Sequence, residues 1–280
     1  MARRARWSRW ISGALGVAFA CLAYIYLTIP DVRVLAAVNP ETTAFIELRR
    51  AEAHDAGKSL TVRRRWVPYN RISNHLKRAV IAAEDGAFFE HEGLDYEQIK
   101  ESFETSLEDG GPMRGASTIT QQLAKNLYLS PSRNPVRKLR ELIITRRLEA
   151  ALSKRRILEI YLNSIEWGDG IFGCDAAARA YFRKSAAELS ARDAALLAGA
   201  IINPRVHNPA KPTRRLLRRQ QIILRRMGGA RPPPDAPVTP VETTPPAEAL
   251  PAAEPTTPTE PPPPKTLPPP GVSDAVAPIA

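Results

Sequence analysis

The chain opens with a long apolar run that is flanked by arginines. Residues 11–29 carry no charged side chain, and nineteen helical residues at about 1.5 Å each span roughly 28 Å, close to the hydrocarbon thickness of a bilayer. Arginines precede the run and tyrosines lie near its far end, as the positive-inside rule and the aromatic belt require. We therefore predict a transmembrane helix at residues 11–29, after a cytoplasmic basic segment at residues 1–10. The run is longer than in a cleaved signal peptide, which is the alternative.

After this run, apolar residues recur at helical spacing through residues 40–229. Thr118 and Ser190 are typical N-cap residues, and Thr118 forms a capping-box pattern with Gln121. Residues 139–152 are apolar on almost every side, which predicts a helix through the centre of a core. These patterns predict a mainly α domain at residues 40–229.

The C-terminal segment, residues 230–280, has a different composition. It holds 18 of the 27 prolines, together with Thr, Ala and Glu and almost no large apolar residues. Such a segment buries too little apolar surface to offset the entropy of ordering, so we predict a disordered, Pro-rich tail. A solvated linker and a partner-binding segment are both compatible with this composition.

Charge and cysteine content narrow the function classes. The formal net charge of +11 favours an anionic partner, such as nucleic acid, lipid headgroups or pyrophosphate. Cys21 and Cys174 are too few for a disulfide framework. The segment around residues 115–126 also resembles half of a helix-turn-helix. A domain outside the cytoplasmic membrane does not meet DNA, so the predicted topology excludes a nucleic-acid partner.

Glu84 interrupts an apolar stripe. It follows Leu76 and Val80 at intervals of four, where a core helix calls for an apolar side chain. Glu84 and Asp85 also stand at the predicted C-terminal end of the helix, where the helix dipole disfavours negative charge. Partial burial raises the pKa of a carboxylate toward the range of a general base. The alternative is a glutamate that reaches solvent from a helix end.

Glu141 lies on the apolar helix with two cations on the same face. Arg137 and Lys138 precede it by four and three residues. One interpretation is a structural ion-pair cluster, since buried charges are usually paired. The other is an anion site, in which the cations bind phosphate oxygens and the carboxylate orients them or holds a divalent ion.

Between these two acids lies a helix with one polar face. Gln121 and Lys125, and likewise Gln122 and Asn126, are separated by four residues. Amides and an ammonium group suit sugar hydroxyls and phosphates.

At these residues the chain resembles a known family, the peptidoglycan glycosyltransferases of glycosyltransferase family 51, and within it the monofunctional biosynthetic transglycosylases. The family motif E-D-x-x-F-x-x-H-x-G matches Glu84 to Gly93, and G-x-S-T-I-T-Q-Q-L-x-K-N matches Gly115 to Asn126. R-K-x-x-E matches Arg137 to Glu141, and R-I-L-E-x-Y-L-N matches Arg156 to Asn163. A fifth, less strict block lies within residues 181–204.

The resemblance implies a lysozyme-like helical fold and a peptidoglycan glycan-strand polymerase. In the family, the 4-hydroxyl of the GlcNAc of lipid II attacks C1 of the growing strand and expels undecaprenyl pyrophosphate. The resemblance assigns the general base to Glu84. It assigns to Glu141 the second catalytic carboxylate, which with a divalent cation (Mg or Mn) stabilises the leaving pyrophosphate, and thus also the role of metal ligand. It further implies substrate-binding roles for Asp85, Ser117, Thr118, Gln121, Gln122, Lys125, Asn126, Arg133, Arg137 and Lys138.

The S-x-x-K and K-T-G signatures of a penicillin-binding transpeptidase do not occur in this chain, so the resemblance is to a monofunctional enzyme. The expected partners are lipid II, the nascent glycan strand, membrane lipid, separate transpeptidases and other cell-wall or division proteins. The expected location is the bacterial cytoplasmic (inner) membrane, with the N-terminus in the cytoplasm and the catalytic domain in the periplasm. The alternative functions are a lytic transglycosylase and a catalytically inactive cell-wall scaffold.

Overall fold

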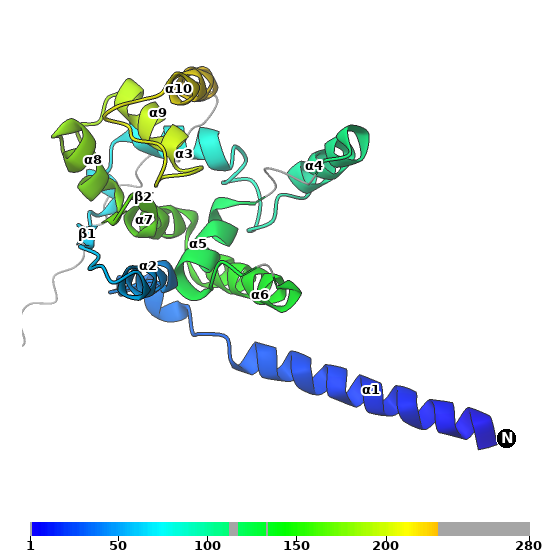
Figure 1. Ribbon diagram of the computed structural model, residues 1–280. Coiled ribbons are helices and arrows are strands. Elements are labelled where there is room, and N and C mark those ends of the chain that lie inside the picture. Colours follow the sequence, from blue (N-terminus) through cyan, green and yellow to red (C-terminus); the bar gives the residue numbers. More distant parts are fainter. Residues whose placement is uncertain (1, 112–116, 133, 229–280) are drawn as a thin grey trace, which may run out of the picture. The chain divides into compact units, whose positions relative to one another are not determined.

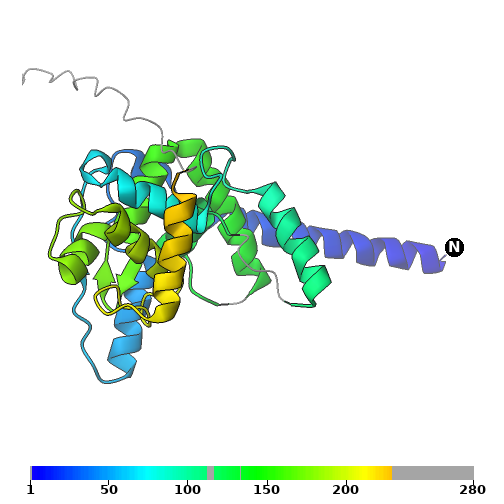
Figure 2. The ribbon, with the colours of Figure 1, turned by 90° about the horizontal axis from the view of Figure 1, so that it is seen from above.

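The computed structural model describes residues 2–111, 117–132 and 134–228, and these residues are mainly helical (Figures 1 and 2). The helices are α1 (Ala2–Leu27), η1 (Arg33–Ala36), α2 (Ala44–Asp55), η2 (Tyr69–Arg71), α3 (Asn74–Glu84), α4 (Tyr96–Asp109), α5 (Ile119–Tyr128), α6 (Pro135–Ala151), α7 (Lys154–Ser164), α8 (Cys174–Phe182), α9 (Ala191–Ala200) and α10 (Arg214–Arg226). The predicted mainly α fold is confirmed. The predicted tail at residues 230–280 lies outside the described residues.

Helix α1 contains residues 11–27 of the predicted membrane span, which ends two residues beyond the helix. Its segment Trp10–Leu27 is long and apolar enough to cross a membrane, by length and composition. Two arginines of α6 bind the chain where α1 ends: Nη2 of Arg140 donates to the hydroxyl of Thr28 at 2.9 Å, and Arg147 donates to the carbonyls of Tyr26 and Ile29. The last carbonyls of a helix lack intrahelical partners, and Arg147 satisfies one of them, that of Tyr26. The other two contacts attach the segment after α1 to α6.

The helical domain contains two groups of packed helices. Helix α9 packs against α3 and α10, and α5 packs against α2, α6 and α7. Helices α7 and α9 both contain long buried runs, from Ile160 to Ser164 in α7 and from Ala194 to Ala200 in α9.

The prediction that residues 139–152 form the central core helix is wrong. They lie in α6, where Leu142 and Ile143 are only half-buried and the buried residues are Glu141, Ile144, Thr145 and Leu148. Helix α6 also contacts α1 and η1, which accounts for apolar residues on its other sides. Apolar composition alone does not distinguish such a helix from a central one.

A small sheet closes one side of the domain. Its strand order is β1 (Arg63–Arg64), β3 (Ile171–Phe172) and β2 (Glu166–Gly168). Strand β1 pairs with β3 in parallel, and β2 pairs with β3 antiparallel. The sheet joins the segment before α3 to the segment between α7 and α8.

Capping fixes where the helices of the site begin. Thr118 and Gln121 form a capping box at the start of α5, and Ser190 forms one with Asp193 at the start of α9, so the predicted helix starts are confirmed. Helix α3 ends at Glu84, so the predicted C-terminal end of this helix is confirmed.

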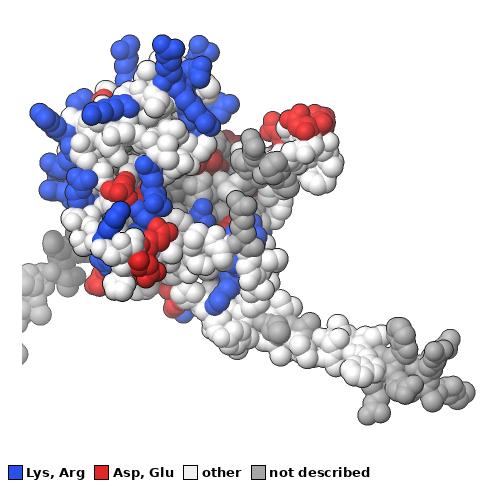
Figure 3. All heavy atoms as spheres, in the orientation of Figure 1, with Lys and Arg blue, Asp and Glu red and all other residues white. Residues whose placement is uncertain are grey.

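Charged side chains are distributed unevenly over the surface (Figure 3). Exposed arginines lie along α10, which contains no acidic residue, and exposed acidic residues lie along α4. Helix α4 has no buried residue, and Phe103 and Leu107 are both more than half exposed. The acidic and basic faces are thus on different helices.

Candidate active site

The carboxylate of Glu84 lies where the end of α3 meets α5 and α10, and its side chain is only 12% exposed. Nε2 of Gln122 donates a 2.9 Å hydrogen bond to its Oε2, and Nη2 of Arg219 lies 3.5 Å from its Oε1. Burial raises the pKa of Glu84 above its ordinary value. The bond from Gln122 and the charges of Arg219 and Lys125 partly oppose this rise in pKa. Glu84 is therefore a stronger base than an exposed glutamate, as general-base catalysis requires.

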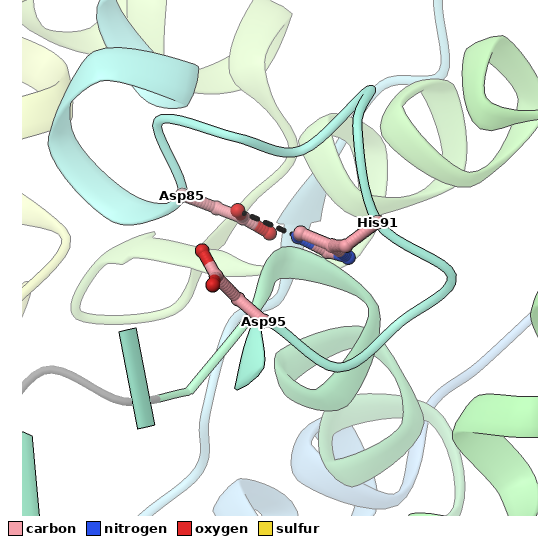
Figure 4. A group of neighbouring side chains, drawn as sticks. All are labelled: Asp85, His91 and Asp95. Carbon is pink, nitrogen blue, oxygen red and sulfur yellow. Dashed lines mark hydrogen bonds and ion pairs between the residues drawn. The ribbon is translucent and has the colours of Figure 1, made fainter. Parts of the chain in front are cut away.

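Asp85 is the buried neighbour of Glu84 and links the first two motifs. Its Oδ2 accepts a 2.9 Å hydrogen bond from the backbone N–H of Ile119, at the start of α5, and its Oδ1 lies 2.9 Å from Nε2 of His91 (Figure 4). A carboxylate is favoured at a helix N-terminus because the first N–H groups there lack partners. In this structure both oxygens of Asp85 contact protein groups, so Asp85 positions α5 next to Glu84.

Gly93 brings the first motif close to α6. Its φ of +84° favours glycine, and an added Cβ would lie 2.7 Å from Cγ2 of Thr145. The hydroxyl of Thr118 donates a 2.8 Å hydrogen bond to the carbonyl of Gly93. Thr118 and Gln121, both buried, use their side chains in this contact and in the capping box of α5. Among the residues predicted to bind substrate, these two stabilise the start of α5.

The polar face of α5 borders a cavity of about 340 Å³. Gln122, Lys125 and Asn126 line it, with residues of α2 and of the segment after α9 on the other sides. Burial lowers the pKa of Lys125, whereas the negative charges of Glu141 and Glu84 raise it. Three of the four residues that sequence spacing places on one polar face of α5 therefore line this cavity, and the fourth, Gln121, belongs to the capping box instead. Ser117 lies exposed just before the helix.

Glu141 lies on the buried face of α6 and is 4% exposed. Its Oε2 accepts a 2.6 Å bond from Nη1 of Arg137, and its Oε1 accepts a 2.5 Å bond from Nζ of Lys138. The Arg137 side chain is 18% exposed, and its Nε is buried with no hydrogen-bond partner in the described structure. Glu141 therefore forms the predicted ion-pair cluster with Arg137 and Lys138, and Nε of Arg137 takes no part in it.

Lys125 connects the two carboxylates electrostatically. Its ammonium group interacts with Glu84 and with Glu141, and also with the cations Arg137 and Lys138. The two acids therefore belong to one electrostatic neighbourhood, in which Glu84 lies at a desolvated helix junction and Glu141 lies among cations. Two carboxylates in contrasting surroundings are typical of enzymes that act on glycosidic bonds.

The protein groups at Glu141 do not by themselves form a complete site for the predicted divalent cation. Both of its oxygens already bind cations, and the described residues place no group of three His, Cys, Asp or Glu ligands there. Such a group does occur at Asp85, His91 and Asp95 (Figure 4). However, Nδ1 of His91 accepts a bond from the backbone N–H of Gly93, so its Nε2 carries the proton and donates to Asp85. Neither histidine nitrogen is free to bind a metal in this arrangement.

Two residues at the site were not predicted from the sequence. Arg219 of α10 approaches Glu84, and the hydroxyl of Tyr161 in α7 donates a 2.9 Å hydrogen bond to Gln122. Tyr161 belongs to the fourth motif and Arg219 to the arginine-rich last helix, but spacing along the chain does not show which residues of distant helices meet. Arg133, a predicted phosphate contact, lies outside the described residues.

Comparisons with known proteins agree with this geometry. The transglycosylase family model matches residues 49–228, and the chain belongs to this family. The biosynthetic peptidoglycan transglycosylase of Laribacter hongkongensis is 51% identical over 189 residues, which cover 68% of this chain and 83% of that protein. The protein of the same name from Thiobacillus denitrificans is 45% identical over 227 residues, 80% of this chain and 97% of that protein. The family indicated by the motifs is confirmed.

Proposed function

We propose that this chain polymerises peptidoglycan glycan strands, with lipid II as the glycosyl acceptor and undecaprenyl pyrophosphate as the leaving group. The transglycosylase family and the names of the relatives support a peptidoglycan glycosyltransferase. The structural observation that carries the finer proposal is the contrast between the two carboxylates: Glu84 is 12% exposed and accepts a hydrogen bond from Gln122, whereas Glu141 binds Arg137 and Lys138.

In the proposed reaction, Glu84 is the general base. Its carboxylate accepts the proton of the GlcNAc 4-hydroxyl while the hydroxyl oxygen forms a bond to C1 of the growing strand. The bond from C1 to the pyrophosphate oxygen breaks, and its electron pair leaves with the pyrophosphate. Because pyrophosphate is a good leaving group, the reaction needs a base at one end and positive charge at the other.

The positive charge comes from Lys125, Arg137 and Lys138. Lys138 is half exposed, and the Arg137 side chain, which is 18% exposed, bonds Glu141 through Nη1. Cations held in place by a buried carboxylate need no reorganisation when the leaving group develops charge. We keep Glu141 as the residue that would contact a divalent cation such as Mg or Mn. Because its oxygens bind Lys138 and Arg137, the substrate phosphates would have to supply most of the ligands, and we assign no step to the ion.

The apolar helix α1 fits a single-pass membrane anchor. We propose that its N-terminus faces the cytoplasm and that the catalytic domain lies in the periplasm, because basic residues precede the span. This orientation places the site at the membrane surface, where a lipid-linked substrate is available. Crosslinking of the strands would then be done by separate transpeptidases.

Incubation of the full-length protein with lipid II tests the proposal. Glycan polymer should form, and purified peptidoglycan should remain intact under the same conditions. Glu84→Gln should abolish polymer formation while the protein still unfolds in a cooperative thermal transition at no lower a temperature than the wild type. Cleavage of purified glycan would instead support a lytic transglycosylase, and binding of lipid II without turnover would support an inactive scaffold.

A further inference from the structure

Glu84 accepts a hydrogen bond from a residue that in turn accepts a hydrogen bond from a third residue. Oε2 of Glu84 accepts a 2.9 Å hydrogen bond from Nε2 of Gln122, and Oε1 of Gln122 accepts a 2.9 Å hydrogen bond from the hydroxyl of Tyr161. The three residues come from α3, α5 and α7. They form a linear hydrogen-bonded chain that ends on the proposed base.

The direction of this chain follows from the chemistry of its two ends. An ionised carboxylate only accepts hydrogen bonds, so the amide group of Gln122 must present its nitrogen to Glu84. Tyr161 is fully buried, and burial raises its pKa well above the ordinary value, so its hydroxyl stays protonated and can donate. The amide oxygen therefore faces Tyr161. The reversed amide would place oxygen against oxygen at the Glu84 end.

We propose that Tyr161 is a positioning residue for the reaction, which fixes the amide of Gln122 so that its N–H group holds the Glu84 carboxylate in the orientation of a base. The proposal rests on the proposed function, because it assigns a task only if Glu84 accepts the proton. The proposal also gives the two oxygens of Glu84 different roles. Oε2 accepts the hydrogen bond from Gln122, and Oε1, which lies 3.5 Å from Arg219, accepts the proton.

The groups around Glu84 explain why this control is needed. Lys125 of α5 and Arg219 of α10 attract the carboxylate, and Asp85 at the end of α3 repels it. The attraction or repulsion of a charge acts on the whole carboxylate and does not fix its rotation. A directed hydrogen bond does, and hydrogen bonds to charged groups are the stronger ones. Without the tyrosine hydroxyl, the amide oxygen would lose its donor and the amide could turn.

The test measures initial rates of lipid II polymerisation at several lipid II concentrations for full-length Tyr161→Phe, Gln122→Met and the double variant. Losing a hydrogen bond to a charged group costs about 1.5–3 kcal/mol, which corresponds to roughly tenfold to a hundredfold in rate. We expect kcat of Gln122→Met to fall by that factor, kcat of Tyr161→Phe to fall by about tenfold, and KM to stay the same in both. The double variant should be no slower than Gln122→Met, because both changes remove one interaction.

Tyr181→Phe is the matched control. The Tyr181 hydroxyl also donates to an acceptor inside the domain, the carbonyl of Trp167 at 3.2 Å. Its removal should leave kcat unchanged, although it also removes an internal hydrogen bond. Equal loss of kcat in both tyrosine variants would show that Tyr161 acts through general stability and would overturn the proposal.

Three further results would overturn the proposal. One is wild-type kcat in Tyr161→Phe, the second is multiplication of the two losses in the double variant, and the third is a raised KM with unchanged kcat in Gln122→Met. If Tyr161→Phe does not fold, Gln122→Met still decides, since wild-type turnover in that variant contradicts any role for the amide. Glu84→Gln distinguishes failure of the proposed function from failure of the positioning proposal. Turnover in that variant would show that Glu84 is not the base. An inactive Glu84→Gln together with a fully active Tyr161→Phe would reject only the role of Tyr161.

Discussion

Arg219 lies in α10, the last helix of the described domain, and Glu84 ends α3. Nη2 of the arginine is nevertheless 3.5 Å from Oε1 of the glutamate. The Arg219 side chain is 33% exposed, and its charge lowers the pKa of a carboxylate that burial raises. The final helix thus contributes one cation to the proposed base, although its other arginines are exposed.

Arg219→Met should move the acidic limb of the rate profile to higher pH. Removing the positive charge lets the pKa of Glu84 rise further, so the base is protonated at a higher pH than in the wild type. An ion pair of this kind is worth up to about 1 kcal/mol, or about fivefold in rate on that limb. The measurement is kcat/KM for lipid II between pH 5 and 9. Arg218→Met, an exposed neighbour on the same helix, is the control and should keep the wild-type profile.

Glu84→Gln should stabilise the fold near neutral pH while abolishing activity. The pKa of Glu84 is higher in the folded than in the unfolded chain, so its contribution to stability is complete below the unfolded value and is lost as pH rises through the folded value. Replacing a destabilising functional group commonly gains about 0.5–2 kcal/mol. The check is Tm at pH 4 and pH 8. The gain should be larger at pH 8, and an equal gain at both values would contradict a raised pKa. Glu104→Gln on exposed α4 is the control.

Gly93→Ala should destabilise the domain. The residue has φ +84°, and a Cβ there would lie 2.7 Å from Cγ2 of Thr145 and 2.9 Å from Cγ of Glu149. Strained backbone and a steric clash each cost about 1–3 kcal/mol. Gly86→Ala is a matched control in the same segment, because its added Cβ would have no atom within 4 Å. Thermal unfolding of both variants decides, and equal Tm values would show that the loop adapts.

Asp95→Asn should leave the metal response of the enzyme unchanged. Asp95 lies near Asp85 and His91, but its Oδ1 accepts the N-cap hydrogen bond of α4 from Gln98, and the histidine nitrogens are already bonded. The measurement is polymerisation of lipid II after chelation and stepwise return of Mg²⁺. The concentration for half-maximal recovery should match that of the wild type. A clear increase would place the ion at these three residues.

The local features of the site were predictable because they depend on neighbours within one helical turn. Thr118 and Gln121 specify the start of α5 through the capping box, which needs only residues three positions apart. Arg137 and Lys138 meet Glu141 for the same reason, since i,i+3 and i,i+4 side chains share a helix face. The order of the motifs was likewise sufficient to indicate the family.

Only the tertiary structure decided which helices meet. The apolar pattern placed α6 at the centre of the core, but α5, α7 and α9 are more fully buried, because the pattern records how apolar a helix is and not which neighbours cover it. The contacts of Glu84 with Gln122 and Arg219 join residues of three helices, and that of Tyr161 with Gln122 adds a fourth. Such contacts depend on the directions in which packed helices cross, and no spacing along the chain encodes them.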